Sequence, residues 1–106
     1  MVELQTIGFE ILTDNTRNEF EKIFEENSKK IDRMLGDAES FRVRLKEHSK
    51  GGKTKFSIHA LVTYAGKTMD AEASDFDLRK VFHMVFKKIE QQIEHEFHIS
   101  NQNKRR

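Results

Sequence analysis

The feature that most constrains this chain is a change of hydrophobic period within residues 66–97. Apolar and polar residues first alternate, which predicts a strand with one buried face carrying Met69, Ala71 and Ala73. Apolar residues then recur every three or four positions, as in the buried stripe of a helix: Leu78, Phe82, Val85, Ile89, Ile93. The stretch therefore predicts a strand that leads directly into a helix. Ser74, with Asp77 three residues later, or Asp75 is expected to cap that helix.

The first third of the chain predicts a short strand and a long helix. Residues 2–7 form the expected strand, and the helix is expected from Thr13 or Asp14 to about Met34 or Leu35. Its buried stripe consists of four residues: Phe20, Phe24, Ile31, Leu35. Asn27 interrupts this stripe, and we expect it at the edge of the stripe or bonded to a neighbour.

The middle of the chain predicts two hairpins. Residues 41–45 alternate apolar side chains with the basic Arg42, Arg44 and Lys46, so this strand has one buried and one basic face. Residues 55–64 form a longer strand. Turns are expected at residues 49–52 and 65–66, because glycine accepts positive φ without steric cost. The three hairpin-linked strands must be antiparallel, whereas the alternation does not show where the first strand joins.

The order of elements is strand, helix, three strands, helix. We therefore predict an α+β fold, β-α-β-β-β-α, in which two helices pack on one face of a four-stranded sheet. A length of 106 residues suits a single domain, expected over residues 1–98, with a basic disordered tail over 99–106.

Composition limits the classes of function. The net charge is +1, so binding to nucleic acid would require cations that are segregated in space. There is no cysteine, which excludes disulfides and thiolate chemistry. No apolar run approaches the ~20 residues of a membrane span, and no secretory signal is recognisable, so we expect a cytoplasmic protein without a membrane partner.

Basic residues gather on the two predicted helices. Arg79, His83 and Lys87 follow one another every four residues, which places them on one ridge with Lys80 and Lys88 beside it. A second cluster, Lys29, Lys30 and Arg33, lies late in the first helix. The residues alone leave two interpretations open: a solvated helix surface, or a surface that binds a polyanion.

Sequence patterns for catalysis and metal binding are weak. His95 and His98 with Glu94 do not have the His-Glu-x-x-His spacing of zinc hydrolases, and no third ligand is indicated. No nucleophile with its base and no phosphate-binding glycine loop stands out. We therefore predict no enzyme activity, no metal, no cofactor and no small-molecule substrate.

The pattern resembles the short ribosome hibernation promoting factors and ribosome-associated inhibitors, the sigma-54 modulation or S30EA family. The most specific part is the last hairpin and helix: Gly66, Met69, Ala71, Ala73, Asp77, Leu78, Phe86, Lys88, Ile89, Gln92, Ile93. Order and spacing match over residues 2–97, although Arg79 stands where the family has a tyrosine. The chain looks like the short form.

The resemblance implies a fold similar to double-stranded-RNA-binding domains and a non-catalytic function. Members bind the small ribosomal subunit in the channel of mRNA and tRNA, and they inhibit translation under stress or in stationary phase. The residues then expected to contact ribosomal RNA (rRNA) are those of the two basic clusters: Lys29, Lys30, Arg33, Arg79, Lys80, His83, Lys87, Lys88. The protein is expected to be a monomer off the ribosome.

Two other functions are compatible with the residues. One is an RNA-binding module of double-stranded-RNA type that acts away from the ribosome. The other is a protein-interaction domain that pairs through an exposed strand edge, with its charges merely solvated. Salt-dependent RNA binding and competition between duplex RNA and ribosomes separate the three.

Overall fold

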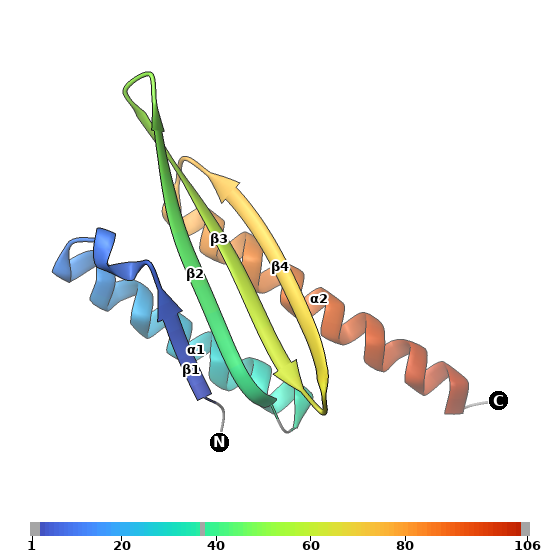
Figure 1. Cartoon of the computed structure of the whole chain (residues 1–106). Coiled ribbons are helices and arrows are strands. Elements are labelled where there is room, and N and C mark those ends of the chain that lie inside the picture. Colours follow the sequence, from blue (N-terminus) through green and yellow to red (C-terminus); the bar gives the residue numbers. More distant parts are fainter. Residues whose placement is uncertain (1–2, 37, 105–106) are drawn as a thin grey trace.

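The computed structural model describes residues 3–36 and 38–104, excluding the side chains of Lys50 and of residues after Glu96. Its elements follow the predicted order (Figure 1): β1 (Glu3–Ile7), a short 3-10 turn (Phe9–Ile11), α1 (Asp14–Leu35), β2 (Ala38–Lys50), β3 (Lys53–Tyr64), β4 (Lys67–Asp75) and α2 (Leu78–Lys104). The predicted β-α-β-β-β-α fold is confirmed.

The sheet has the strand order β1-β2-β3-β4. The first strand, whose position the alternation left open, lies parallel to β2, with Leu4 opposite Phe41 and Thr6 opposite Val43. The helix α1 makes the crossover that a parallel pair requires. The other two pairs are antiparallel hairpins, as predicted.

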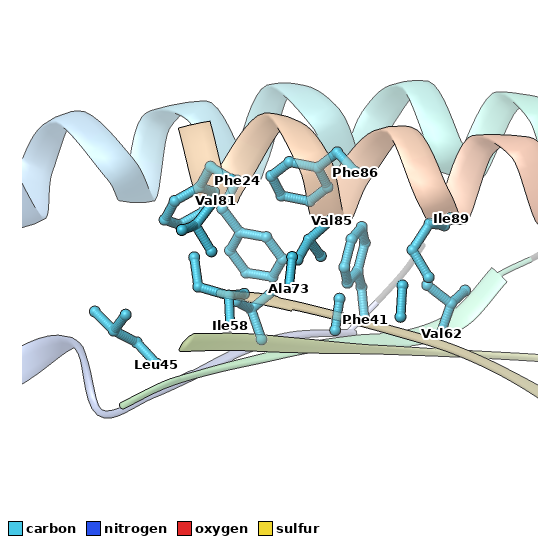
Figure 2. Close-up of a cluster of buried hydrophobic side chains, with 14 of the residues drawn as sticks. Phe24, Phe41, Leu45, Ile58, Val62, Ala73, Val81, Val85, Phe86 and Ile89 are labelled. Atoms are coloured by element: carbon cyan, nitrogen blue, oxygen red, sulfur yellow. The ribbon is translucent and has the colours of Figure 1, made fainter. Parts of the chain in front are cut away.

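Both helices lie behind the sheet as it is drawn in Figure 1, so its other face is left uncovered. The core lies between these two layers and consists of the predicted apolar stripes (Figure 2). Phe41 of β2 holds both helices, because its ring meets Phe24 of α1 at 4.9 Å and Phe86 of α2 at 5.7 Å between centroids. Phe20 and Phe82 stack at 4.6 Å and join the helices to each other. Aromatic pairs of this kind add to the free energy of burying their area.

Gly8 ends β1 in a conformation that no other residue could adopt there. Its φ is +85°, and a Cβ atom in its place would overlap the carbonyl oxygen of Leu45 in β2. This close approach turns the chain so that Phe9 is buried in the core.

The ends of α1 follow the sequence prediction. The Thr13 side chain accepts a hydrogen bond from the backbone N–H of Thr16, and Gly36, with φ +83°, follows Leu35. The amide of Asn27 donates to the carbonyl oxygen of Ile23 at 2.8 Å, which is the bond to a neighbour that we expected.

The start of α2 corrects the prediction. Neither Ser74 nor Asp75 caps the helix; the carboxylate of Asp77 accepts the N–H groups of Arg79 and Lys80. The reason is that β4 continues to Asp75, which pairs with Phe56 of β3. At its other end α2 runs to Lys104, and so the structure describes as helix most of the stretch 99–106 that was expected to be a disordered tail.

Candidate nucleic-acid interface

The two helices lie side by side and run in the same direction. Two ion pairs show this alignment: Glu19 of α1 with Arg79 of α2 at 2.7 Å, and Lys30 of α1 with Glu90 of α2 at 2.9 Å. From the first ion pair to the second, the residue number rises by the same amount in α1 and in α2. The two predicted basic clusters therefore both lie on the outer surface of the two helices. We call this surface the helix-layer surface.

Four of the eight predicted residues already have a partner. Arg79 and Lys30 form the pairs just described, and Lys80 lies 3.6 Å from the carboxylate of Asp75. Lys88 donates to the backbone carbonyl oxygen of Glu72 at 2.9 Å. These four cations hold elements of the fold together, and the pairs are exposed enough to open when a stronger anion approaches.

Lys88 acts together with Gln92 on the edge of the sheet. Gln92 donates to the carbonyl oxygen of Asp70, two residues before Glu72 on β4. Four residues of helix and two residues of strand both advance about 6 Å, so the two side chains match two successive free carbonyls. In this way α2 occupies acceptors of the edge strand that another chain could otherwise bind.

The other four predicted residues have no ion pair among the residues that the structure describes: Lys29, Arg33, His83, Lys87. All four side chains are exposed. Lys29 and Arg33 line a shallow hollow of α1 together with Glu26 and Asp32, so carboxylates stand beside them. The helix-layer surface is thus accessible and contains cations, but acidic residues are interspersed among them.

Asp75 is the last residue of β4, just before α2. The pKa of its carboxyl group is lowered. The first cause is the backbone N–H of Asp77, which donates to it, followed by the backbone N–H of Phe76 and then by the neighbouring Lys80. The carboxylate therefore stays ionised as the partner of Lys80, and it fixes the turn between β4 and α2.

A further tie joins the sheet to α2. The hydroxyl of Tyr64 in β3 donates to Glu96 at 2.6 Å, and Lys67 lies 3.2 Å from the same carboxylate. The bond to Glu96 raises the pKa of Tyr64 to about 12, and the same bond, together with Lys67, lowers the pKa of Glu96. The C-terminal half of α2 is fixed against the end of the β3–β4 hairpin by this tie.

The sequence-based site omitted two surface features. The open face of the sheet also carries basic residues, and their signal was the alternation of Arg42, Arg44 and Lys46 in β2. Phe76, between β4 and α2, is 59% exposed, and the sequence pattern assigned it to neither core nor surface. Because it lies in a short connection without periodicity, no sequence signal distinguished it.

The described part of the chain shows neither a cluster of metal ligands nor a membrane-spanning helix. Among those residues, no three potential metal ligands converge. His95 and His98, which the sequence analysis did not assign to a metal site, are only half described, since the side chain of His98 lies outside the described residues. Within the same part, none of the helices combines the length and apolar character needed to cross a bilayer.

The family model of the sigma 54 modulation protein / S30EA ribosomal protein matches residues 9–98, which include α1, most of α2 and the strands β2 to β4. The chain belongs to this family. The S30EA family is associated with ribosomes, and the resemblance found in the sequence is thereby confirmed.

Solved structures support the S30EA fold. A ribosomal subunit interface protein from Coxiella burnetii has a TM-score of 0.57 and 19% identity, over 90% of this chain and 94% of that one. The Protein Y N-terminal domain of Thermus thermophilus has a TM-score of 0.52 and 24% identity, over 88% and 93% of the two chains. The comparison with curated proteins found no match.

Proposed function

We propose that this protein is a ribosome hibernation factor. In this proposal it binds the rRNA of the small ribosomal subunit in the channel that mRNA and tRNA occupy, and it inhibits translation in stressed or stationary-phase cells. The observation that carries the proposal is the family match over residues 9–98, which includes all the residues of both basic clusters. Binding takes place in the cytoplasm and requires no catalysis and no cofactor.

The physical basis of binding is the neutralisation of phosphates. Lysine and arginine side chains displace the cations condensed on RNA, and the release of those cations drives association. On the helix-layer surface the four basic residues without an ion pair in the described chain would make the first contacts: Lys29, Arg33, His83, Lys87. Arg79, Lys80 and Lys30 would then exchange their carboxylate partners for phosphate. Occupation of the channel excludes mRNA and tRNA by volume.

Pairing through a strand edge receives less support than RNA binding. On β4, Lys88 and Gln92 occupy the carbonyl oxygens of Glu72 and Asp70, so a partner strand would have to displace both side chains. A double-stranded-RNA module that acts off the ribosome shares the chemistry of the proposal. Competition between duplex RNA and ribosomes distinguishes such a module from a ribosome hibernation factor.

Sedimentation with purified small subunits tests the proposal. At low salt the protein should move with the subunits, and an excess of duplex RNA should not release it. Lys29→Glu with Lys87→Glu should reduce the bound fraction, because both reversals place acids where phosphates would lie. Arg17→Glu with Lys22→Glu, an equal change of net charge in the acidic first half of α1, is the control. Protein that remains at the top of the gradient with intact subunits would reject the proposal.

A further inference from the structure

The open face of the sheet carries a set of basic residues that the proposed function does not use. We call this set the sheet-face basic residues: Arg42, Arg44, Lys46, Lys55, His59. The register brings them together, because Arg44 lies opposite His59 and Lys46 lies opposite Ser57 on neighbouring strands. Alternation along β2 and β3 points them away from the core, since Val43 and Ala60 between them are fully buried.

The sheet-face basic residues lack acidic partners within the described chain, apart from His59. The guanidinium of Arg42 donates to the neutral amide oxygen of Gln5 at 2.9 Å. Arg44, Lys46 and Lys55 form no ion pair among the described residues, whereas His59 lies 3.1 Å from Asp70. The acids of this face are Asp70 and Glu72 on β4 and Glu3 on β1. Positive charge is therefore concentrated over β2 and β3.

The centre of this face is hollowed. Five side chains line a depression of about 190 Å³: Arg44, Lys46, Ser57, His59, Glu72. Four of these side chains carry hydrogen-bond donors. The depression is larger than several water molecules, which occupy ~30 Å³ each. The row from Arg42 to Lys46 extends over about 13 Å, a length along which one strand of a nucleic-acid helix presents about four phosphates. Arginine, lysine, serine and histidine around a hollow suit a phosphate backbone.

We propose that this open face is a second phosphate-binding surface, and that it contacts a different RNA segment from the helix-layer surface. The proposal rests on the proposed function, and it adds that the protein lies between two segments of rRNA. The two surfaces face opposite ways, and the molecule is 19 Å thick along its shortest axis. A single channel wall could not reach both.

An acidic protein segment is the competing occupant, and the composition of the face argues against it. Protein interfaces are held by buried aromatic or aliphatic anchors in pockets. The hollow is lined by polar and charged side chains only, and the apolar residues beside it on this face, Ile7 and Leu61, are both half-buried. A surface of donors without an apolar anchor favours RNA phosphate.

Hydroxyl-radical footprinting of small subunits saturated with the protein tests this inference. We expect two separate groups of protected nucleotides. Arg44→Glu with Lys46→Glu should remove one group and weaken binding at least about tenfold, with a salt slope lower by about 1.5. Lys29→Glu with Lys87→Glu should remove the other group. Arg44→Gln with Lys46→Gln should give a smaller loss, and thermal unfolding should show that all variants fold.

The outcomes separate this inference from the proposed function. If the wild type protects two groups and Arg44→Glu with Lys46→Glu keeps both at wild-type affinity, the second surface is refuted and the proposed function stands. A single protected group refutes it as well. Weaker binding with unchanged rRNA protection would refute it in favour of an acidic protein partner. A wild type that protects no rRNA refutes the proposed function and this inference together.

Discussion

The helix-layer surface and the open face of the sheet are both basic, but their charges are arranged differently. On the helix layer, Arg79 and Lys30 face carboxylates of the neighbouring helix at 2.7 and 2.9 Å. On the sheet, Arg44 and Lys46 face His59 and Ser57 of β3, and the acids of this face lie on β4 and, as Glu3, at the start of β1. Antiparallel hairpins gather every second residue of a strand on one face, so a basic alternation gives a basic surface. Two parallel helices instead bring acidic and basic segments into contact.

The largest expected effect compares the two faces of one strand. Val43 is fully buried and Arg44 is exposed, although they are neighbours in β2. Val43→Asp buries an unpaired charge, and the free energy of unfolding should fall by more than about 4 kcal/mol. Arg44→Asp should change it by less than about 0.5 kcal/mol. Chemical denaturation followed by circular dichroism measures both. Equal losses of unfolding free energy in the two variants would mean that this face of the sheet is covered in the folded protein.

A second pair of neighbours on α2 compares a lysine that stabilises the fold with a lysine that is proposed to bind RNA. Lys88 is bonded to β4, whereas Lys87 has no ion pair among the described residues. Lys88→Ala should lower the free energy of unfolding by about 1 kcal/mol, because a hydrogen bond to the sheet is lost. Lys87→Ala should leave stability unchanged and reduce RNA binding. Denaturation and filter binding of the two variants check this, and exchanged effects would contradict the assignment.

Removal of the acidic partners should leave Arg79 and Lys30 of the helix-layer surface without ion pairs, like the described cations on the open face of the sheet. Glu19→Gln with Glu90→Gln frees Arg79 and Lys30 for phosphate, so RNA affinity should rise about threefold at low salt. Glu21→Gln with Glu25→Gln changes the net charge equally on α1 and is the matched control. Fluorescence anisotropy with a labelled RNA measures both. An equal gain in the control would show that only net charge matters.

The smallest effect concerns the tie between Tyr64 and Glu96, which holds the sheet against α2. Tyr64→Phe should cost about 0.5 kcal/mol at neutral pH. The folded protein lowers the pKa of Glu96, so this contribution should be lost as the pH falls through that lowered value. The pKa of Tyr64 is raised to about 12, so the contribution is complete below pH 10.0 and is lost as the pH rises through about 12. Unfolding curves of both proteins across pH check this. A difference that stays constant into acid would contradict it.

The fold could be predicted largely from the sequence, because burial of one face imposes its period on each element. Met69, Ala71 and Ala73 showed the strand, and the spacing of Phe82, Val85 and Ile89 showed the helix. The parallel position of β1 could not be predicted, since pairing of segments far apart depends on tertiary packing. The cap of α2 was mistaken because three neighbouring residues can all cap a helix, and only pairing with β3 selects Asp77.

The site was predictable in its composition but not in its pairing. The sequence correctly indicated that basic residues of both helices reach the surface. It could not show that Glu19 meets Arg79, because that contact requires the parallel alignment of helices distant in the chain. The basic alternation of β2 was visible in the sequence. Its significance appeared only when the structure left that face of the sheet uncovered.

The proposed function requires the protein to bind ribosomal phosphate through cations on its surface. The most direct measurement is the affinity of the wild-type protein for small ribosomal subunits as a function of salt concentration. Our account predicts a linear fall of log K against log salt with a slope of about −4 or steeper, since each phosphate contact contributes about −0.7 to −0.9. Binding that is tight and independent of salt would contradict it.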